Sequence, residues 1–196
     1  MRRALQTAIL LATGLATMAV AHPHVFVDAT VKAVFDQNSL VGIRNHWVYD
    51  EIYSAATFAS ADADGNGQLS QKESEQLKNT VLGPLASKNF YNYVLVETDF
   101  YATDGIKNFK AEMKNGKLVL DFTVLFSIAA KKDYTMVTIA VDDLTNYIQI
   151  TTDMESADVD APDEMDVEFF ADDLKGLTMF RAFRTGVQGL SLRLKK

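Results

Sequence analysis

The chain contains 196 residues, carries a formal net charge of −7 and has no cysteine. Without cysteine, neither a disulfide nor a thiolate metal site can form, so a metal would have to be held by imidazole, carboxylate, carbonyl or amine groups. The acidic balance suits cations and argues against nucleic acid as a partner, because a basic face that could neutralise phosphates is missing.

Residues 1–21 have the pattern of a secretory signal peptide. Arg2 and Arg3 precede an apolar stretch, 4–20, and Ala19-Val20-Ala21 forms an A-x-A cleavage signal. The alternative is a membrane anchor, but the stretch has neither the length nor the flanking residues of a spanning helix. We therefore expect segment 1–21 to be cleaved and the mature protein to be exported to the periplasm.

The next segment, 22–49, predicts a β-hairpin. Residues 24–35 and 40–49 are rich in β-branched and aromatic side chains, and 36–39 between them have the composition of a turn. The hairpin would place the beginning of the mature chain at the edge or in the middle of a sheet.

Segment 50–89 predicts a helix–loop–helix. Asp50 can cap a first helix that runs through Phe58, because apolar residues recur there at intervals of three and four. A second helix is expected from about Ser70 to residue 81 or 82, where Gly83 and Pro84 follow. The two helices flank an acidic loop.

Segment 90–196 predicts a β-rich region that packs with the hairpin as one domain. An Asn-Gly turn at 115–116 indicates a second hairpin, and 153–173 is interpreted as a mostly irregular connector around a short strand, 167–170. The expected strands are 91–96, 109–113, 117–124, 135–141, 147–151 and 190–194. The fold class is therefore α+β, with an antiparallel sheet or sandwich and an inserted helix–loop–helix near its start.

The loop 62–73 matches the twelve-residue EF-hand calcium loop at its diagnostic positions. Gly67 stands at the sixth position, where the chain turns sharply through a conformation that is costly for other residues. The alternative is an acidic turn that merely caps a helix. The expected calcium ligands are Asp62, Asp64, Asn66, Gln68 through its backbone carbonyl, Ser70 and Glu73.

This is a single loop, which favours constitutive binding rather than sensing. The affinity expected of such an extracellular module is on the order of 10⁻⁴ to 10⁻³ M. Calcium would then brace the fold.

The three histidines, His22, His24 and His46, all lie near the start of the mature chain and form a second candidate metal site. Cleavage would add a free amine on His22, and Asp28, on the same strand face as His24, could assist. Pro23 lacks an amide hydrogen, which excludes the square-planar amide chelate of an amino terminus with histidine third. Zn²⁺, Ni²⁺, Co²⁺ and Cu²⁺ remain open, as does an ordinary frayed terminus with a packed His46.

These residues resemble a known family, the exported bacterial proteins of the domain-of-unknown-function 1007 family. The resemblance is carried by 22–28, 46–54 and the loop 62–73, with a further stretch at 143–147. Members are described as periplasmic components of an uncharacterised ABC-type transport system, and some occur alongside or fused to nickel and cobalt exporters. The resemblance implies a metal role for the three histidines, whereas the acidic residues 153–166 depart from it.

The leading hypothesis is a periplasmic metal-binding accessory protein of divalent transition-metal transport, stabilised by one EF-hand calcium, whose partner is an inner-membrane metal transporter. The alternatives are a copper protein or enzyme with a histidine brace made by His22 and His46, and a calcium-stabilised envelope interaction module. We expect no enzyme, because no nucleophile motif stands out. The acidic pairs Asp142-Asp143 and Asp172-Asp173 are interpreted as solvated turns rather than catalytic carboxylates.

Overall fold

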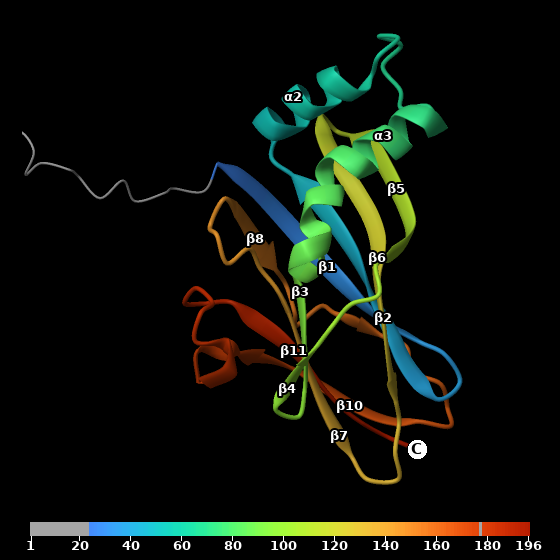
Figure 1. Cartoon of the computed structure of the whole chain (residues 1–196), viewed down its shortest axis with the longest axis vertical. Coiled ribbons are helices and arrows are strands. Elements are labelled where there is room, and N and C mark those ends of the chain that lie inside the picture. The colour runs from blue at the N-terminus through green and yellow to red at the C-terminus, as the bar shows by residue number, and fades with distance from the viewer. Residues whose placement is uncertain (1–23, 177) are drawn as a thin grey trace, which may run out of the picture.

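The computed structural model describes residues 24–176 and 178–196 (Figure 1). The predicted signal peptide, 1–21, and the candidate ligand His22 lie outside the described residues. Within the described ranges, no helix combines the length and the apolar character needed to cross a bilayer. The α+β class is confirmed, because a few helices accompany two mostly antiparallel sheets.

The first sheet is six-stranded. Its order is β5 (Ile106–Lys114), β6 (Lys117–Ala129), β2 (Ser39–Tyr49), β1 (Val25–Phe35) and β8 (Ile148–Thr152), with β9 (Asp158–Val159) also pairing with β1. The hairpins β1–β2 and β5–β6 are antiparallel. However, β8 and β9 run parallel to β1, so the expectation of a wholly antiparallel sheet is wrong at this edge. Strand β7, which precedes β8 in the chain, belongs to the other sheet. The chain crosses to that sheet and then returns beside β1, running in the same direction as β1.

The second sheet is five-stranded and antiparallel. Its order is β10 (Asp166–Asp173), β11 (Gln188–Lys195), β7 (Thr135–Val141), β3 (Asn92–Val96) and β4 (Asp99–Tyr101). Buried side chains from both sheets form one cluster, with Trp47 and Phe122 from the first sheet and Ile139 and Leu192 from the second. The two sheets thus share a hydrophobic core, whose burial is the main favourable contribution to folding.

Strand β10 contains the short strand predicted at 167–170, but it is longer than expected and leaves less of 153–173 irregular. Its eight residues all pair with β11. Glu168 forms an ion pair with Arg193 (2.8 Å) and Asp166 forms one with Lys195 (3.2 Å). Acidic residues are depleted in strands generally, and the sequence therefore did not predict the acidic ends of this strand, which pair with β11.

Three helical segments connect β2 to β3. They are α2 (Glu51–Ala61), α3 (Gln71–Val81) and the 3-10 segment η1 (Gly83–Tyr91). Figure 1 shows α2 and α3 at one end of the molecule, beside β5 and β6. The helix–loop–helix is therefore attached to the far edge of the first sheet from β8.

Buried polar contacts hold α2 on this sheet. Ser54 is fully buried, and its Oγ accepts the N–H of Leu118 in β6 (2.7 Å) and donates to the carbonyl of Tyr49 (3.3 Å). Asp50 caps α2 and also accepts the N–H of Phe26 in β1 (2.9 Å). Because buried polar groups must be paired, these contacts fix where the helix starts.

The pair Asp142-Asp143 is not a solvated turn, which corrects the sequence interpretation, since both residues are fully buried. Oδ1 of Asp142 accepts two hydrogen bonds from Arg184 (2.6 and 3.2 Å). Asp143 accepts the N–H and the hydroxyl of Thr145 (2.9 and 2.7 Å). Burial acts to raise the pKa of Asp143, but these hydrogen bonds lower it on balance. The other pair, Asp172-Asp173, forms the end of β10.

Candidate metal centre

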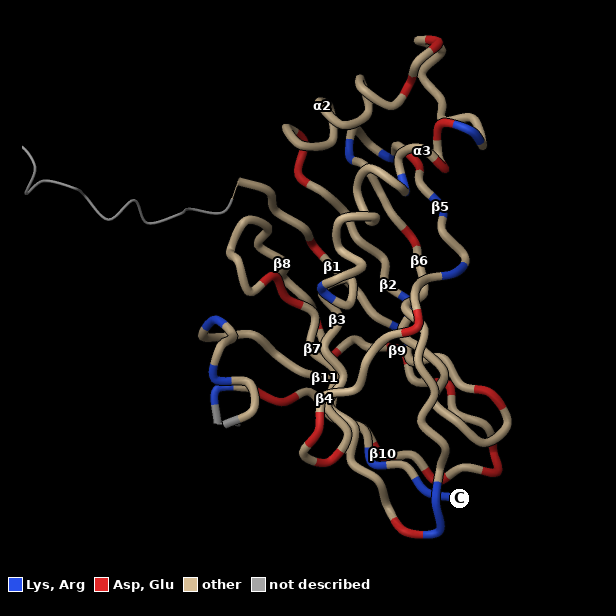
Figure 2. Tube along the Cα trace, in the orientation of Figure 1, with Lys and Arg blue, Asp and Glu red and all other residues tan. Residues whose placement is uncertain are grey.

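The loop between α2 and α3 is built from the two helix ends. It lies at one extreme of the molecule, and acidic residues mark its tip in Figure 2. Asp62 is the C-cap of α2, with its N–H bonded to the carbonyl of Phe58 (2.8 Å). Ser70 is the N-cap of α3, in a reciprocal capping box with Glu73. The helices therefore fix the first and last acidic residues of the loop.

Three of the predicted calcium ligands converge. Asp62, Asp64 and Glu73 each offer a carboxylate oxygen, and these oxygens all lie within 4.8 Å of one another. Within the described residues, 24–176 and 178–196, no other group of three His, Asp or Glu side chains meets this criterion. None of the three carboxylates forms an ion pair with a described Lys or Arg. Adjacent like charges repel each other, so the cluster favours a bound cation.

The loop backbone wraps around the first of these carboxylates. Asp62 accepts the N–H of Asn66 (3.1 Å) through Oδ1 and the N–H of Gly67 (2.8 Å) through Oδ2. Both glycines of the loop have positive φ, 68° at Gly65 and 79° at Gly67. Glycine adopts this conformation without the steric cost that a side chain imposes. The turn therefore depends on the residue type that the sequence pattern requires at Gly67.

In the middle of the loop, the side chain and backbone of Asn66 form hydrogen bonds with its neighbours Asp64 and Gln68. Asn66 donates from Nδ2 to Asp64 (2.8 Å) and accepts the N–H of Gln68 (2.8 Å) through Oδ1. Asp64 also accepts the N–H of Asn66 (3.1 Å). The predicted ligands Asn66 and Gln68 thus lie within the same hydrogen-bonded loop as the acidic cluster.

Glu73 is buried and held at both carboxylate oxygens. Oε1 accepts the N–H of Ala63 (2.7 Å), and Oε2 accepts the N–H (2.8 Å) and the hydroxyl (2.7 Å) of Ser70. The hydroxyl of Ser70, followed by the two backbone N–H groups, lowers the pKa of Glu73 below its ordinary value. The carboxylate is therefore ionised and oriented at neutral pH, as a metal ligand must be.

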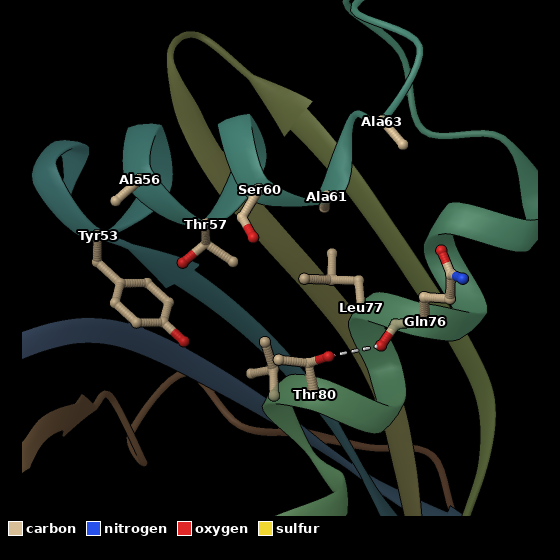
Figure 3. Close-up of a pocket in the computed structure, with 10 residues that line it drawn as sticks. Tyr53, Ala56, Thr57, Ser60, Ala61, Ala63, Gln76, Leu77 and Thr80 are labelled. Carbon is tan, nitrogen blue, oxygen red and sulfur yellow. Dashed lines mark hydrogen bonds between the residues drawn. The ribbon is translucent and has the colours of Figure 1, made fainter.

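The loop and its helices also contact the sheet and each other. Leu69 packs against the hydrophobic core, and a cavity of about 230 Å³ separates the loop from Ala111 and Met113 of β5. Between α2 and α3 lies a cleft of about 380 Å³ whose lining includes Tyr53 and Leu77. Figure 3 shows these side chains converging from the two helices. The loop thus lies between an edge strand and an interhelical cleft.

The candidate histidine site is not brought together in the same way. His46 lies opposite Thr30 in the β1–β2 register, whereas His24 comes before the first residue of β1. The six residues from His24 to Thr30 place the two histidines about 20 Å apart along the strand. His46 Nδ1 instead lies 3.2 Å from Oδ1 of Asp121 in β6. The structure therefore does not gather His24 and His46 into one site.

The remaining candidates lie at the start of β1. His24 is exposed, and its ring lies against Tyr147 with a centroid distance of 5.5 Å. Asp28 is also exposed and shares the outward face of β1 with Phe26, as alternation along a strand requires. The placement of His22 lies outside the described residues. His24 and Asp28 are the described residues that could take part in a site at the chain start.

Sequence reasoning missed the Asp121 partner of His46. Asp121 lies in β6, far along the sequence, and only the β2–β6 register places it opposite His46. Alternating polar residues in 117–124 could have indicated that Asp121 faces solvent, but not which residue it faces.

Comparison with known proteins identifies relatives without a described activity. A family described as "Protein of unknown function (DUF1007)" matches residues 7–171. A protein of Haemophilus influenzae, described as an uncharacterized protein, is 24% identical over 139 residues. The match covers 70% of this chain and 66% of that protein. Neither description names a ligand, a substrate or a partner.

Proposed function

The chain belongs to the DUF1007 family of proteins of unknown function. Since this family description names no activity, we propose a function from the candidate metal centre. The protein is an exported calcium-binding protein, and residues 62–73 form a single EF-hand. The observation that carries this proposal is the convergence of Asp62, Asp64 and Glu73, whose carboxylate oxygens lie within 4.8 Å of one another.

The chemistry of these groups favours calcium over other divalent ions. The site offers oxygen ligands, which hard cations prefer, and no imidazole comes from the loop itself. Residues 62–73 also have the EF-hand spacing, in which a carbonyl and a bidentate glutamate complete the coordination. Ca²⁺ accepts this irregular set of six to eight oxygens more readily than Mg²⁺, which requires near-ideal octahedral geometry.

Calcium at this site would join the end of α2 to the start of α3. Asp62 caps the first helix and Glu73 belongs to the first turn of the second, so one ion would link both to the same point. Binding to the folded state alone stabilises a protein by mass action. The role of the ion is therefore structural, and it holds the helix–loop–helix against β5 and β6.

The decisive experiment compares Glu73→Gln with Glu75→Gln. Glu75 lies in the same helix, is exposed and, among the described residues, pairs with Lys78 alone, so its variant removes the same charge outside the loop. Calorimetric titration of the cleaved protein should give one calcium per chain, and calcium should raise its melting temperature. Glu73→Gln should abolish most of that increase, whereas Glu75→Gln should retain it. Identical melting of the parent protein in calcium and in chelator would refute the proposal.

Export is the second part of the proposal. It rests on the charged start, the apolar stretch and the A-x-A signal of residues 1–21. Expression of the full chain in a Gram-negative host should deliver the protein to the periplasmic fraction with His22 as its first residue. Mass spectrometry of that fraction measures the cleavage site. A protein of full mass in the cytoplasm contradicts this part alone and leaves calcium binding unaffected.

A transition-metal transport role is the second candidate. It is favoured by the exposed position of His24 directly before β1, next to the amine that cleavage would create on His22. Such a site could pass Zn²⁺, Ni²⁺ or Co²⁺ to or from an inner-membrane transporter. Metal analysis of correctly cleaved protein separates the possibilities. A transition metal that is lost in His24→Ala supports this role, copper with oxygen-dependent turnover supports a histidine-brace enzyme, and calcium alone supports an envelope module.

A further inference from the structure

A pocket on the outward face of the first sheet is independent of the calcium loop. It has a volume of about 370 Å³ and lies over β1, β2 and β6. Ser156 and Asp158, from the connection between β8 and β9 and from β9 itself, form its wall. The volume falls within the range of small-molecule sites, which is roughly 300 to 1,000 Å³.

The floor of this pocket holds an unfavourable arrangement of charge. Lys32 of β1 lies directly opposite Arg44 of β2 in the antiparallel register. Like charges in directly opposed positions destabilise a sheet. His46, two residues from Arg44, also lines the pocket. Two cations and an imidazole thus line one pocket of a chain with a net charge of −7, beside the carboxylates of Asp121 and Asp158.

Carboxylates neutralise these cations only in part. Asp158 pairs with Lys32 (2.7 Å), and a single oxygen of Asp121 serves both Arg44 (3.2 Å) and His46 (3.2 Å). A guanidinium has five N–H donors and an ammonium has three. Among the described residues, the Arg44 and Lys32 side chains make one hydrogen bond each. Both cations therefore keep several donors available toward the pocket or solvent.

The geometry points to a binding site for a small molecule that carries an oxyanion, either a carboxylate or a phosphate. The planar donors of Arg44 match the two oxygens of such a group, and Lys32 supplies a point charge beside it. Thr30, opposite His46 in the register, adds a hydroxyl at the same wall of the pocket. The bound anion would offset the repulsion between Lys32 and Arg44.

The site is tested by titrating the cleaved protein, before any calcium is added, with sodium phosphate and, separately, with sodium succinate at constant ionic strength. Calorimetry or amide chemical shifts should show saturable binding of at least one of the two anions up to about 10 mM. The anion that saturates at the lower concentration identifies the ligand chemistry. Chloride at the same concentrations serves as the reference.

The variants distinguish a built site from general charge. Arg44→Gln should weaken binding by about tenfold or more, the loss expected for a charge-assisted hydrogen bond. Lys117→Gln is the control, because Lys117 belongs to β6 of the same sheet, pairs with Glu51 and does not line the pocket. It should change the affinity by less than about twofold. Asp158→Asn should tighten binding, because it releases Lys32 from its competing partner.

Three results would overturn the inference. They are the absence of saturable binding by both anions, an equal loss of affinity in Lys117→Gln and Arg44→Gln, and weaker binding in Asp158→Asn. Circular dichroism and thermal melting of each variant report folding separately. If Arg44→Gln is unfolded, Arg44→Lys keeps the charge, loses the planar fork and should still weaken binding. None of these outcomes depends on the calcium proposal, since calcium affinity is measured in the same samples.

Discussion

The loop 62–73 and the hairpin β1–β2 both contain candidate metal ligands, but only the ligands of the loop lie close together. In the loop, ligands two or three residues apart converge because local turns fold the chain around them. In the hairpin, His24 and His46 are far apart because the register between two strands places His46 opposite Thr30. A contiguous motif carries its own geometry, whereas a site built across strands depends on pairings that the motif does not contain.

The largest expected effect on the free energy of unfolding comes from a substitution in the buried core of the hairpin β1–β2, and it tests whether the hairpin and the loop are independent. Trp47 is fully buried and packs edge-on against Phe122 at a centroid distance of 5.0 Å. Trp47→Ala should lower the free energy of unfolding by about 3–5 kcal/mol, measured by urea denaturation in chelator. The stabilisation by calcium should remain. If Trp47→Ala also abolished the stabilisation by calcium, the stabilities of the loop and the hairpin would not be independent. Trp47→Phe is a milder variant for the same measurement.

An intermediate effect is expected where the helix–loop–helix meets the sheet. Ser54→Ala leaves the buried N–H of Leu118 and the carbonyl of Tyr49 without this partner, which should cost about 1–3 kcal/mol of unfolding free energy. Ser60→Ala, an exposed substitution in the same helix, should be nearly neutral. If both variants melt alike, the hydroxyl of Ser54 does not anchor α2.

A smaller, pH-dependent effect is expected from Glu73. Because its folded-state pKa lies below the ordinary value of 4.5, its contribution to stability is fully present above that value and is lost as the pH falls through the lower, folded-state pKa. In chelator, the melting temperature of the parent protein should fall more steeply in this acidic range than that of Glu73→Gln. Parallel pH profiles would show that the contacts of Glu73 with Ser70 and Ala63 contribute nothing to acid stability.

The smallest effect is expected from His46. The contact of its Nδ1 with Asp121 (3.2 Å) is partly exposed, and exposed polar pairs contribute about 0–1 kcal/mol. His46→Ala should therefore change the unfolding free energy by less than about 1 kcal/mol and leave any zinc binding at the chain start intact. Zinc calorimetry of His46→Ala beside His24→Ala measures this. An equal loss of zinc affinity in both variants would indicate that His24 and His46 share one site, and it would contradict the contrast between the hairpin and the loop.

The sequence predicted the elements whose signals are local. The two hairpins, both helices and the end of α3 before Gly83 and Pro84 follow from alternation, periodicity, capping and turn residues, and all are present. The acidic cluster of the loop also follows from spacing alone. These features need no knowledge of distant partners.

The sequence could not predict features that depend on distant partners. The parallel pairing of β8 with β1 requires knowing that β7 joins the other sheet. The burial of Asp142 requires Arg184, and the pairing of Asp121 with His46 requires the β2–β6 register. In each case a residue or strand far along the chain decides the outcome, and the local composition does not identify it.

The position of β1 between β2 and β8 also has a kinetic consequence. Val25 belongs to the first strand that a ribosome or an export channel would release, yet its parallel neighbour Ile148 emerges only after most of the chain. Pairings of such large sequence separation require loop closure before they return free energy, and they slow folding. The edge of β1 that receives β8 therefore stays unpaired until residues 148–152 have been synthesised.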